Sequence, residues 1–202
     1  MVNYQWKLHP GAVIVFEGLD RTGKSTQLAR LAASLKDSTA VFAHMPSGFT
    51  PFTNRVYEAL EAQGQAPASG LATQLAHLAC HAENMAPLTE ALQSKALVLD
   101  RWWWSTLAYG WYGGSVEQSG LSEQSFRELI QTIWAPIVPS VVFVFLKPHQ
   151  ADRNNADGVE AGYRALMGEH ADLTVAVPPR DPDETHKFIV DELVRRDIAS
   201  PA

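Results

Sequence analysis

The feature that most constrains the fold of this chain is an apolar run that ends at a glycine-bounded turn. Residues 12–16 are all apolar, with β-branched residues in the middle, which is typical of a strand buried on both faces of a parallel sheet. Residues 18–25 then read GLDRTGKS, and apolar residues at helical spacing follow them. This succession of strand, turn and helix predicts an α/β fold with a turn at the end of a buried strand.

The alternation of apolar strands and helices continues along the chain. Further strands are predicted at residues 40–44, 96–99, 140–146 and 173–177, and helices at residues 52–62, 71–94, 122–134 and from Asp181 onward. We therefore expect a single domain, residues 1–202, with three α/β/α layers and a five-stranded, mostly parallel sheet. The polar stretch 147–158 has no periodicity, so it is expected to form a short mobile lid beyond a strand end.

Length, charge and cysteine content narrow the class of protein. The longest apolar stretch, residues 141–146, is far shorter than the roughly 20 residues that span a bilayer. The first ten residues carry no apolar segment of signal-peptide length, and Cys80 is the one cysteine, so no internal disulfide can form. These features favour a cytoplasmic protein without a membrane partner. The formal net charge of −6 argues against binding nucleic acid by surface charge alone.

The glycine-bounded turn matches the pattern G-x-x-x-x-G-K-[ST], and each of its parts favours phosphate binding. The two glycines let the loop curl so that successive backbone N–H groups point inward, and the following helix adds the positive end of its dipole. Lys24 supplies a mobile positive charge, and Ser25 a hydroxyl that can ligate Mg²⁺. The predicted phosphate-binding residues are Gly18, Leu19, Arg21, Thr22, Gly23, Lys24, Ser25 and Thr26.

A second pair of charged residues, Asp100 and Arg101, directly follows the strand predicted at residues 96–99. By itself, such a pair is most often an ordinary surface ion pair at a strand end. Next to a phosphate-binding loop, the carboxylate can hold Mg²⁺ through water or orient an attacking oxygen, and the guanidinium can bind two phosphate oxygens. We therefore predict that Asp100 and Arg101 belong to the same site as the loop.

Taken together, these residues resemble the thymidylate kinases, a family of nucleoside monophosphate kinases. The resemblance rests on residues 16–27 and on Asp100, Arg101 and Trp102, and continues through Ser105, Ala108 and Tyr109. Weaker matches are residues 46–48, Tyr163 and Leu166. The resemblance implies a fold of the P-loop NTPase type, ATP as phosphoryl donor, Mg²⁺ as cofactor, a pyrimidine deoxynucleotide as acceptor, and a homodimer.

The resemblance also implies a role for individual residues. Lys24 and the loop would hold the phosphates of ATP with Ser25 on Mg²⁺, Asp20 would contact the sugar of the acceptor, and Asp100 and Arg101 would align acceptor, metal and donor. Some members of the family take their catalytic arginine from the loop and others from the lid. Here the loop contains Arg21, whereas the lid segment offers only Lys147 and Arg153. The expected catalytic residues are therefore Arg21, Lys24, Asp100 and Arg101, with Arg153 in the lid.

The departures from the family pattern concern the base of the acceptor. Family members usually carry an arginine in the long helix before the second motif, but residues 71–95 contain no arginine. The expected acceptor-binding residues are Asp20, Arg55, His81, Arg101, Trp102 and Tyr109. The acceptor is accordingly expected to be dTMP or a dUMP analogue modified at position 5.

Two other functions remain open on the sequence. One is a kinase that phosphorylates a hydroxyl, such as that of 5-hydroxymethyluracil, free or within DNA, with Asp100 or Asp20 as the base. The other is a nucleotide-binding module without catalytic activity. Two smaller questions also stay open: whether residues 102–104, three consecutive tryptophans, stack on a base or fill the core, and whether Arg180 lies near an adenine.

Overall fold

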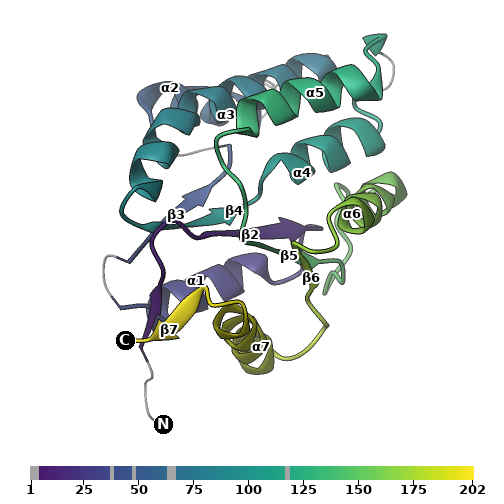
Figure 1. Ribbon diagram of the computed structural model, residues 1–202. Coiled ribbons are helices and arrows are strands. Elements are labelled where there is room, and N and C mark those ends of the chain that lie inside the picture. Colours follow the sequence, from purple (N-terminus) through teal and green to yellow (C-terminus); the bar gives the residue numbers. More distant parts are fainter. Residues whose placement is uncertain (1–4, 37–38, 47–48, 63–66, 117–118) are drawn as a thin grey trace.

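The fold is built around one parallel sheet, with helices on both of its faces (Figure 1). The computed structural model describes residues 5–36, 39–46, 49–62, 67–116 and 119–202. The sheet has five strands in the order β3-β4-β2-β5-β6, and every neighbouring pair is parallel. Its strands are β2 (Val13–Gly18), β3 (Ala40–His44), β4 (Ala96–Asp100), β5 (Val141–Phe145) and β6 (Thr174–Ala176). The predicted α/β class and the five-stranded sheet are confirmed.

The strands read as uniformly apolar because both of their faces are covered. Alternate residues of β2 enter different cores: Val13 and Val15 pack on one side, and Ile14 and Phe16 on the other. Figure 1 shows α1 and α7 against one face of the sheet and α2, α3 and α5 beyond the other. The helices are α1 (Lys24–Ser34), α2 (Pro51–Glu61), α3 (Gly70–Leu92), α4 (Trp103–Leu107), α5 (Glu123–Trp134), α6 (Asp157–Glu169) and α7 (Pro182–Arg195).

Helix starts follow the capping residues that the sequence offers. Asp181 caps α7 by accepting the backbone N–H groups of Asp183 and Glu184, and Pro182 occupies the first turn, where its missing N–H costs nothing. The Ser122 side chain caps α5 in the same way. Both starts agree with the sequence analysis. Among the described residues, no helix combines the length and apolar character needed to cross a membrane.

Several elements were missed by the sequence analysis. β1 (Trp6–Leu8) pairs antiparallel with β7 (Ala199–Pro201), and such three-residue strands carry too few residues to show a period. Helix α6 begins at Asp157, inside the stretch 147–158 that was assigned to the lid. A π-helical turn, Ala108–Tyr112, extends α4 and carries Tyr109.

The three consecutive tryptophans fill the core. Trp103 and Trp104 are almost completely buried, Trp102 is 5% exposed, and all three rings lie within 6.2 Å of one another, centroid to centroid. Trp102 also lines a cavity described below. Cys80 is fully buried, as expected of a small apolar core residue.

Replacing Trp104 should therefore be costly. Trp104 is 0% exposed, so Trp104→Ala removes a large apolar side chain and leaves a cavity, and the free energy of unfolding should fall by about 3–5 kcal/mol. Val138→Ala is the control, because Val138 is 72% exposed and its loss should change stability by less than about 0.5 kcal/mol. Urea unfolding of both variants measures the difference, and equal stabilities would contradict the packing described here.

Candidate active site

The loop between β2 and α1 has a backbone that only particular residues can adopt. Gly18 has φ 125°, and a Cβ at this position would lie 2.1 Å from the carbonyl oxygen of Phe145 on β5, so only glycine fits. Gly23, which precedes α1, has φ 90°. Arg21 has φ 60° although it is not glycine, a conformation that side-chain-bearing residues seldom adopt. Residues 18–25 therefore form the curled loop that the sequence analysis predicted.

Lys24 is drawn back into this loop. Its Nζ donates to the carbonyl oxygen of Leu19 at 2.6 Å and to that of Gly18 at 3.2 Å. Burial, together with the charge of Arg101, lowers the pKa of Lys24 to about 8. A bound anion would offset both effects, so the loop is built to receive negative charge beside Lys24.

A cavity of about 350 Å³ opens above the loop, and we call it the phosphate cavity. It is lined by Asp20, Arg21, Thr22, Gly23, Lys24, Ser25, Thr26, His44, Asp100 and Arg101. The structure thus brings both sequence motifs to one site, as predicted. All four residues expected to be catalytic line this cavity, since Arg21, Lys24, Asp100 and Arg101 are among them.

The oxygen donors of the phosphate cavity suit Mg²⁺. His44 Nδ1 lies 2.9 Å from Asp100 Oδ2; although burial alone raises the pKa of Asp100, His44, Arg101 and Lys24 hold it below its usual range, so the carboxylate is ionised at neutral pH. Ser25 adds a hydroxyl. Within the described residues no three His, Cys, Asp or Glu side chains cluster as a metal cage. Mg²⁺ takes few protein ligands and completes its shell with water and phosphate oxygens, so the carboxylate of Asp100 and the hydroxyl of Ser25 are donors that could hold it.

Below the loop lies a buried carboxylate that the sequence analysis missed. Glu17, on β2, is 0% exposed and accepts four hydrogen bonds: from Trp102 N at 2.7 Å, Ser105 N at 3.0 Å, Ser105 Oγ at 2.6 Å and Tyr163 Oη at 2.9 Å. Burial raises its pKa, and the nearby charge of Arg101 opposes that rise. The signal in the sequence was a charged residue inside an otherwise apolar strand.

Arg101 is held on several sides at once. One terminal nitrogen donates to Ser105 Oγ at 2.9 Å, to Gly18 O at 3.3 Å and to Tyr163 Oη at 3.5 Å, and the other forms an ion pair with Asp20. Its own backbone has φ 75°. The guanidinium is therefore fixed between the loop and the start of α4 rather than free to search for a ligand.

The segment after β5 lies against the loop. His149 N donates to Arg21 O at 2.8 Å, Arg21 Nε lies 3.3 Å from Asp152 Oδ2, and Asn155 hydrogen-bonds to Asp20. Arg153, the expected lid arginine, is exposed and is not among the described residues that line the cavities of this site. Of the two candidate arginines, Arg21 lines the phosphate cavity and Arg153 does not.

A second cavity of about 350 Å³ continues from the phosphate cavity, with which it shares Asp20, His44 and Arg101. We call it the acceptor cavity. Five of the six residues expected to bind the acceptor line it: Asp20, His81, Arg101, Trp102 and Tyr109. Arg55 does not. It lies on the exposed side of α2, where its Nε donates to Pro51 O at 3.1 Å beside a groove formed with Phe52 and Val56. The register of α2, unknown from the sequence, accounts for this difference.

The far end of the acceptor cavity is polar but uncharged. Burial lowers the pKa of His77 to about 4 and that of His81 to about 3, so both imidazoles are neutral at pH 7. His81 Nε2 lies 3.2 Å from Thr106 Oγ1, and Asn84 donates to Pro46 O at 3.0 Å. The weaker match at residues 46–48 extends beyond Pro46 into Ser47 and Gly48, which lie outside the described residues.

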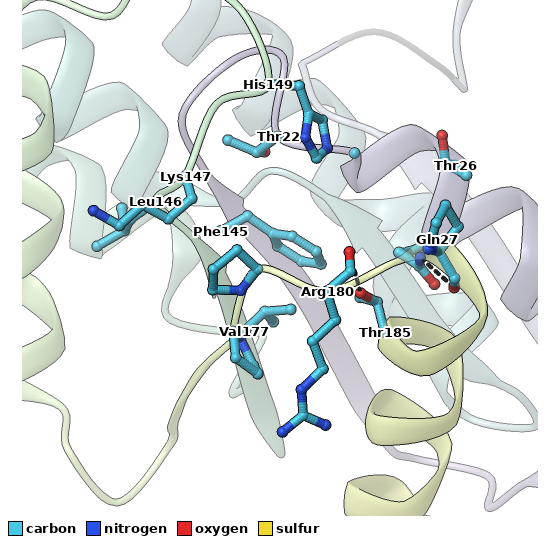
Figure 2. Close-up of a pocket in the computed structure, with 14 residues that line it drawn as sticks. Thr22, Thr26, Gln27, Phe145, Leu146, Lys147, His149, Val177, Arg180 and Thr185 are labelled. Atoms are coloured by element: carbon cyan, nitrogen blue, oxygen red, sulfur yellow. Dashed lines mark hydrogen bonds between the residues drawn. The ribbon is translucent and has the colours of Figure 1, made fainter.

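A third cavity, of about 280 Å³, lies on the other side of the loop, and we call it the donor cavity (Figure 2). Figure 2 shows Phe145 near the middle, with Thr22 and His149 above it and Val177, Arg180 and Thr185 below it. The walls are mainly apolar, which suits a flat heterocycle. Arg180 does line this cavity, with its guanidinium 5.4 Å from the ring centre of Phe188. Phe145 and His149 were not singled out from the sequence.

The arrangement of the loop and its cavities defines a class of protein. One anion-binding loop at the carboxyl ends of parallel strands separates a donor cavity from an acceptor cavity, and cationic side chains meet between them. This is the architecture of a P-loop phosphotransferase. The family model for thymidylate kinase matches residues 16–152, and the chain therefore belongs to the thymidylate kinase family. It is a nucleoside monophosphate kinase whose family uses ATP as phosphoryl donor.

Individual relatives match two thirds or more of this chain. A thymidylate kinase of Chlorobium chlorochromatii is 29% identical over 220 residues, covering 91% of this chain and 95% of that protein. One from Pelodictyon phaeoclathratiforme is 33% identical over 146 residues, covering 69% and 63%. The solved thymidylate kinase of Ehrlichia chaffeensis, 22% identical, superposes with a TM-score of 0.72 over 92% of this chain and 100% of that chain. The Candida albicans structure gives a TM-score of 0.68 at 19% identity and 96% coverage of both.

The neutral histidines predict how stability depends on pH. The folded state keeps His81 unprotonated down to about pH 3, whereas the unfolded chain protonates it near pH 6.5, so this stability is present above pH 6.5 and is lost as the pH falls below it. Between pH 7 and pH 5, His81 alone should lower the free energy of unfolding by about 2 kcal/mol. Urea unfolding of the wild type and of His81→Gln at both pH values measures this, and an equal pH dependence in the two proteins would contradict it.

Proposed function

We propose that this protein transfers the γ-phosphoryl group of ATP to the phosphate of a pyrimidine deoxynucleoside monophosphate, with Mg²⁺ as cofactor. One observation supports this most directly. The phosphate cavity shares Thr22, Gly23 and Thr26 with the donor cavity, and Asp20, His44 and Arg101 with the acceptor cavity. A donor and an acceptor bound in these cavities would meet at the loop, end to end, as in-line transfer requires.

The proposed roles follow from position and charge. Lys24 and the loop N–H groups bind the donor phosphates, and Arg101, fixed by Asp20 and Ser105, binds the acceptor phosphate. Arg21 lines the phosphate cavity with its side chain 60% exposed, so it can reach the transferring group and neutralise its charge. Ser25 and Asp100 would hold Mg²⁺, which supplies charge neutralisation on the phosphate oxygens.

A phosphate acceptor fits the cavity better than a hydroxyl. Transfer to a hydroxyl needs a general base, and the two carboxylates at hand are engaged: Asp20 with Arg101, and Asp100 with His44. An acceptor phosphate is already ionised and needs no base. The structure provides positioning and positive charge, which is what that reaction demands.

The acceptor base would lie at the uncharged end of its cavity, near His77, His81 and Thr106. Among the described residues that line this cavity, Arg101 is the only arginine, and it is held at the phosphate end. The base would then be read by neutral groups. We propose dTMP or a 5-modified dUMP as the acceptor on this ground.

A substrate panel with loop variants tests the proposal. ATP consumption is measured with dTMP, dUMP, 5-hydroxymethyl-dUMP, dCMP and hydroxymethylated DNA, and the diphosphate product should form with at least one pyrimidine deoxynucleotide. Arg21→Ala and Lys24→Ala should lower kcat by about 10³-fold, since each removes a charge from the transferring phosphoryl group. Arg164→Ala and Lys187→Ala, which remove exposed charges on α6 and α7, are the matched controls. Transfer to a hydroxyl only, or a nearly unchanged Arg21→Ala, would overturn the assignment.

Removing the metal gives an independent check. Chelation of Mg²⁺ with EDTA should abolish transfer, and adding Mg²⁺ should restore it fully, because few protein ligands hold the ion. Ser25→Ala should raise the Mg²⁺ concentration needed for half-maximal rate, with little change in the KM for the acceptor. The rate is followed across a Mg²⁺ titration at fixed ATP. Undiminished activity in EDTA would contradict the role given to Ser25 and Asp100.

A further inference from the structure

The side chain of Asn155 joins the segment after β5 to the phosphate-binding loop. Its Oδ1 accepts the backbone N–H of Asp20 at 2.8 Å, and its Nδ2 donates to the backbone carbonyl of the same residue at 2.9 Å. Tyr109 Oη also donates to Oδ1, at 3.4 Å. One amide group thus satisfies both backbone groups of Asp20, and its two ends cannot be exchanged without losing both bonds.

The next peptide of the loop is held from the same side. His149 N donates to the carbonyl of Arg21 at 2.8 Å. In a planar trans peptide, the N–H of each residue points opposite to the carbonyl before it. With the carbonyls of Asp20 and Arg21 turned to the lid segment, the N–H groups of Arg21 and Thr22 must point away from it. Both residues line the phosphate cavity, whereas no described residue of 147–158 does, so these N–H groups face the phosphates.

This loop conformation needs contacts from outside the loop to stabilise it. Arg21 has φ 60°, the left-handed region that residues with a side chain seldom occupy, and it persists only where the surroundings fix it. A rotation of the Asp20–Arg21 peptide would relieve the strain and turn the Arg21 N–H away from the phosphate cavity. Asn155 opposes that rotation at the carbonyl and at the preceding N–H.

Hydrogen bonds within its own segment fix the backbone of Asn155. Its backbone N–H donates to Asp152 O at 3.1 Å, and the N–H of Asn154 donates to the Asp152 carboxylate at 2.9 Å, which closes a turn. Two residues later α6 begins, and Tyr163 on that helix contacts both Glu17 and Arg101. Asn155, which contacts the loop, therefore lies next to the same helix, α6, whose Tyr163 contacts Arg101 at the acceptor cavity.

We propose that Asn155 is a positioning residue for phosphoryl transfer, which keeps the Asp20–Arg21 peptide oriented so that the loop N–H groups and Arg21 face the phosphates. The inference rests on the function proposed above and adds a residue outside both sequence motifs. Asn155 contacts the backbone of the loop and is not among the described residues that line the phosphate cavity.

Two variants separate the two hydrogen bonds. Asn155→Ala removes both, and Asn155→Asp keeps the size and the acceptor but replaces the donor to the Asp20 carbonyl with a repelling oxygen. Both should lower kcat by about 10- to 100-fold, because small misplacements of catalytic groups have effects of this size. The KM for the acceptor should change less than about threefold. Exchange of the Asp20 amide hydrogen, followed by NMR, should accelerate in Asn155→Ala and stay slow in Asn155→Asp.

Asn54→Ala, an exposed asparagine on α2, is the control and should keep the wild-type kcat. A kcat within twofold of wild type in either Asn155 variant, a raised acceptor KM without loss of kcat, or unchanged Asp20 exchange in Asn155→Ala would overturn the inference. If Asn155→Ala fails to fold, the isosteric Asn155→Asp decides by its kcat. A wild-type protein that phosphorylates no nucleoside monophosphate would overturn the proposed function and this role with it, whereas active wild type with unaltered variants overturns the inference alone.

Discussion

A fully buried carboxylate holds the catalytic end of this molecule together. Glu17 stands at the end of the central strand and receives the backbone N–H groups of Trp102 and Ser105, where α4 begins, and the hydroxyl of Tyr163 from α6. A buried charge is costly unless hydrogen bonds surround it, and here they do. The same partners position Arg101. The loop, the second motif and α6 are therefore fixed relative to one another through one side chain.

The donor cavity and the acceptor cavity lie on opposite sides of the loop. The donor cavity lies on the α7 side, against Thr185, and the acceptor cavity lies between α3 and the residues that follow β4. The loop belongs to both. The carboxyl ends of β2 and β4 bring Lys24, Asp100 and Arg101 together between the two cavities. The proposed donor and acceptor could therefore meet there without movement of the sheet.

The elements that could be predicted from the sequence are those encoded by a local pattern of residues. Apolar runs identified the five strands, and two glycines with Lys24 and Ser25 identified the loop. Asp100 and Arg101 were placed correctly because parallel strands end at the same edge. Arg55 lies outside the acceptor cavity, since the rotation of α2 about its axis decides which side this residue faces. Glu17 and Asn155 were missed because their partners are far away in the sequence: those of Glu17 lie 85 to 146 residues away, and Asp20 lies 135 residues from Asn155. No spacing rule reports such contacts.

The antiparallel ribbon of β1 and β7 has a consequence for how the backbone is connected. Residue 202 donates its amide to the carbonyl of Gln5, and Figure 1 shows the paired strand β7 below the sheet, beside α1 and α7. The first and last described residues, 5 and 202, are therefore in contact. A short linker could join residues 5 and 202, and the chain could then be opened at an exposed turn with every strand of the sheet preserved. The order of the elements along the chain is therefore separable from the structure that they form.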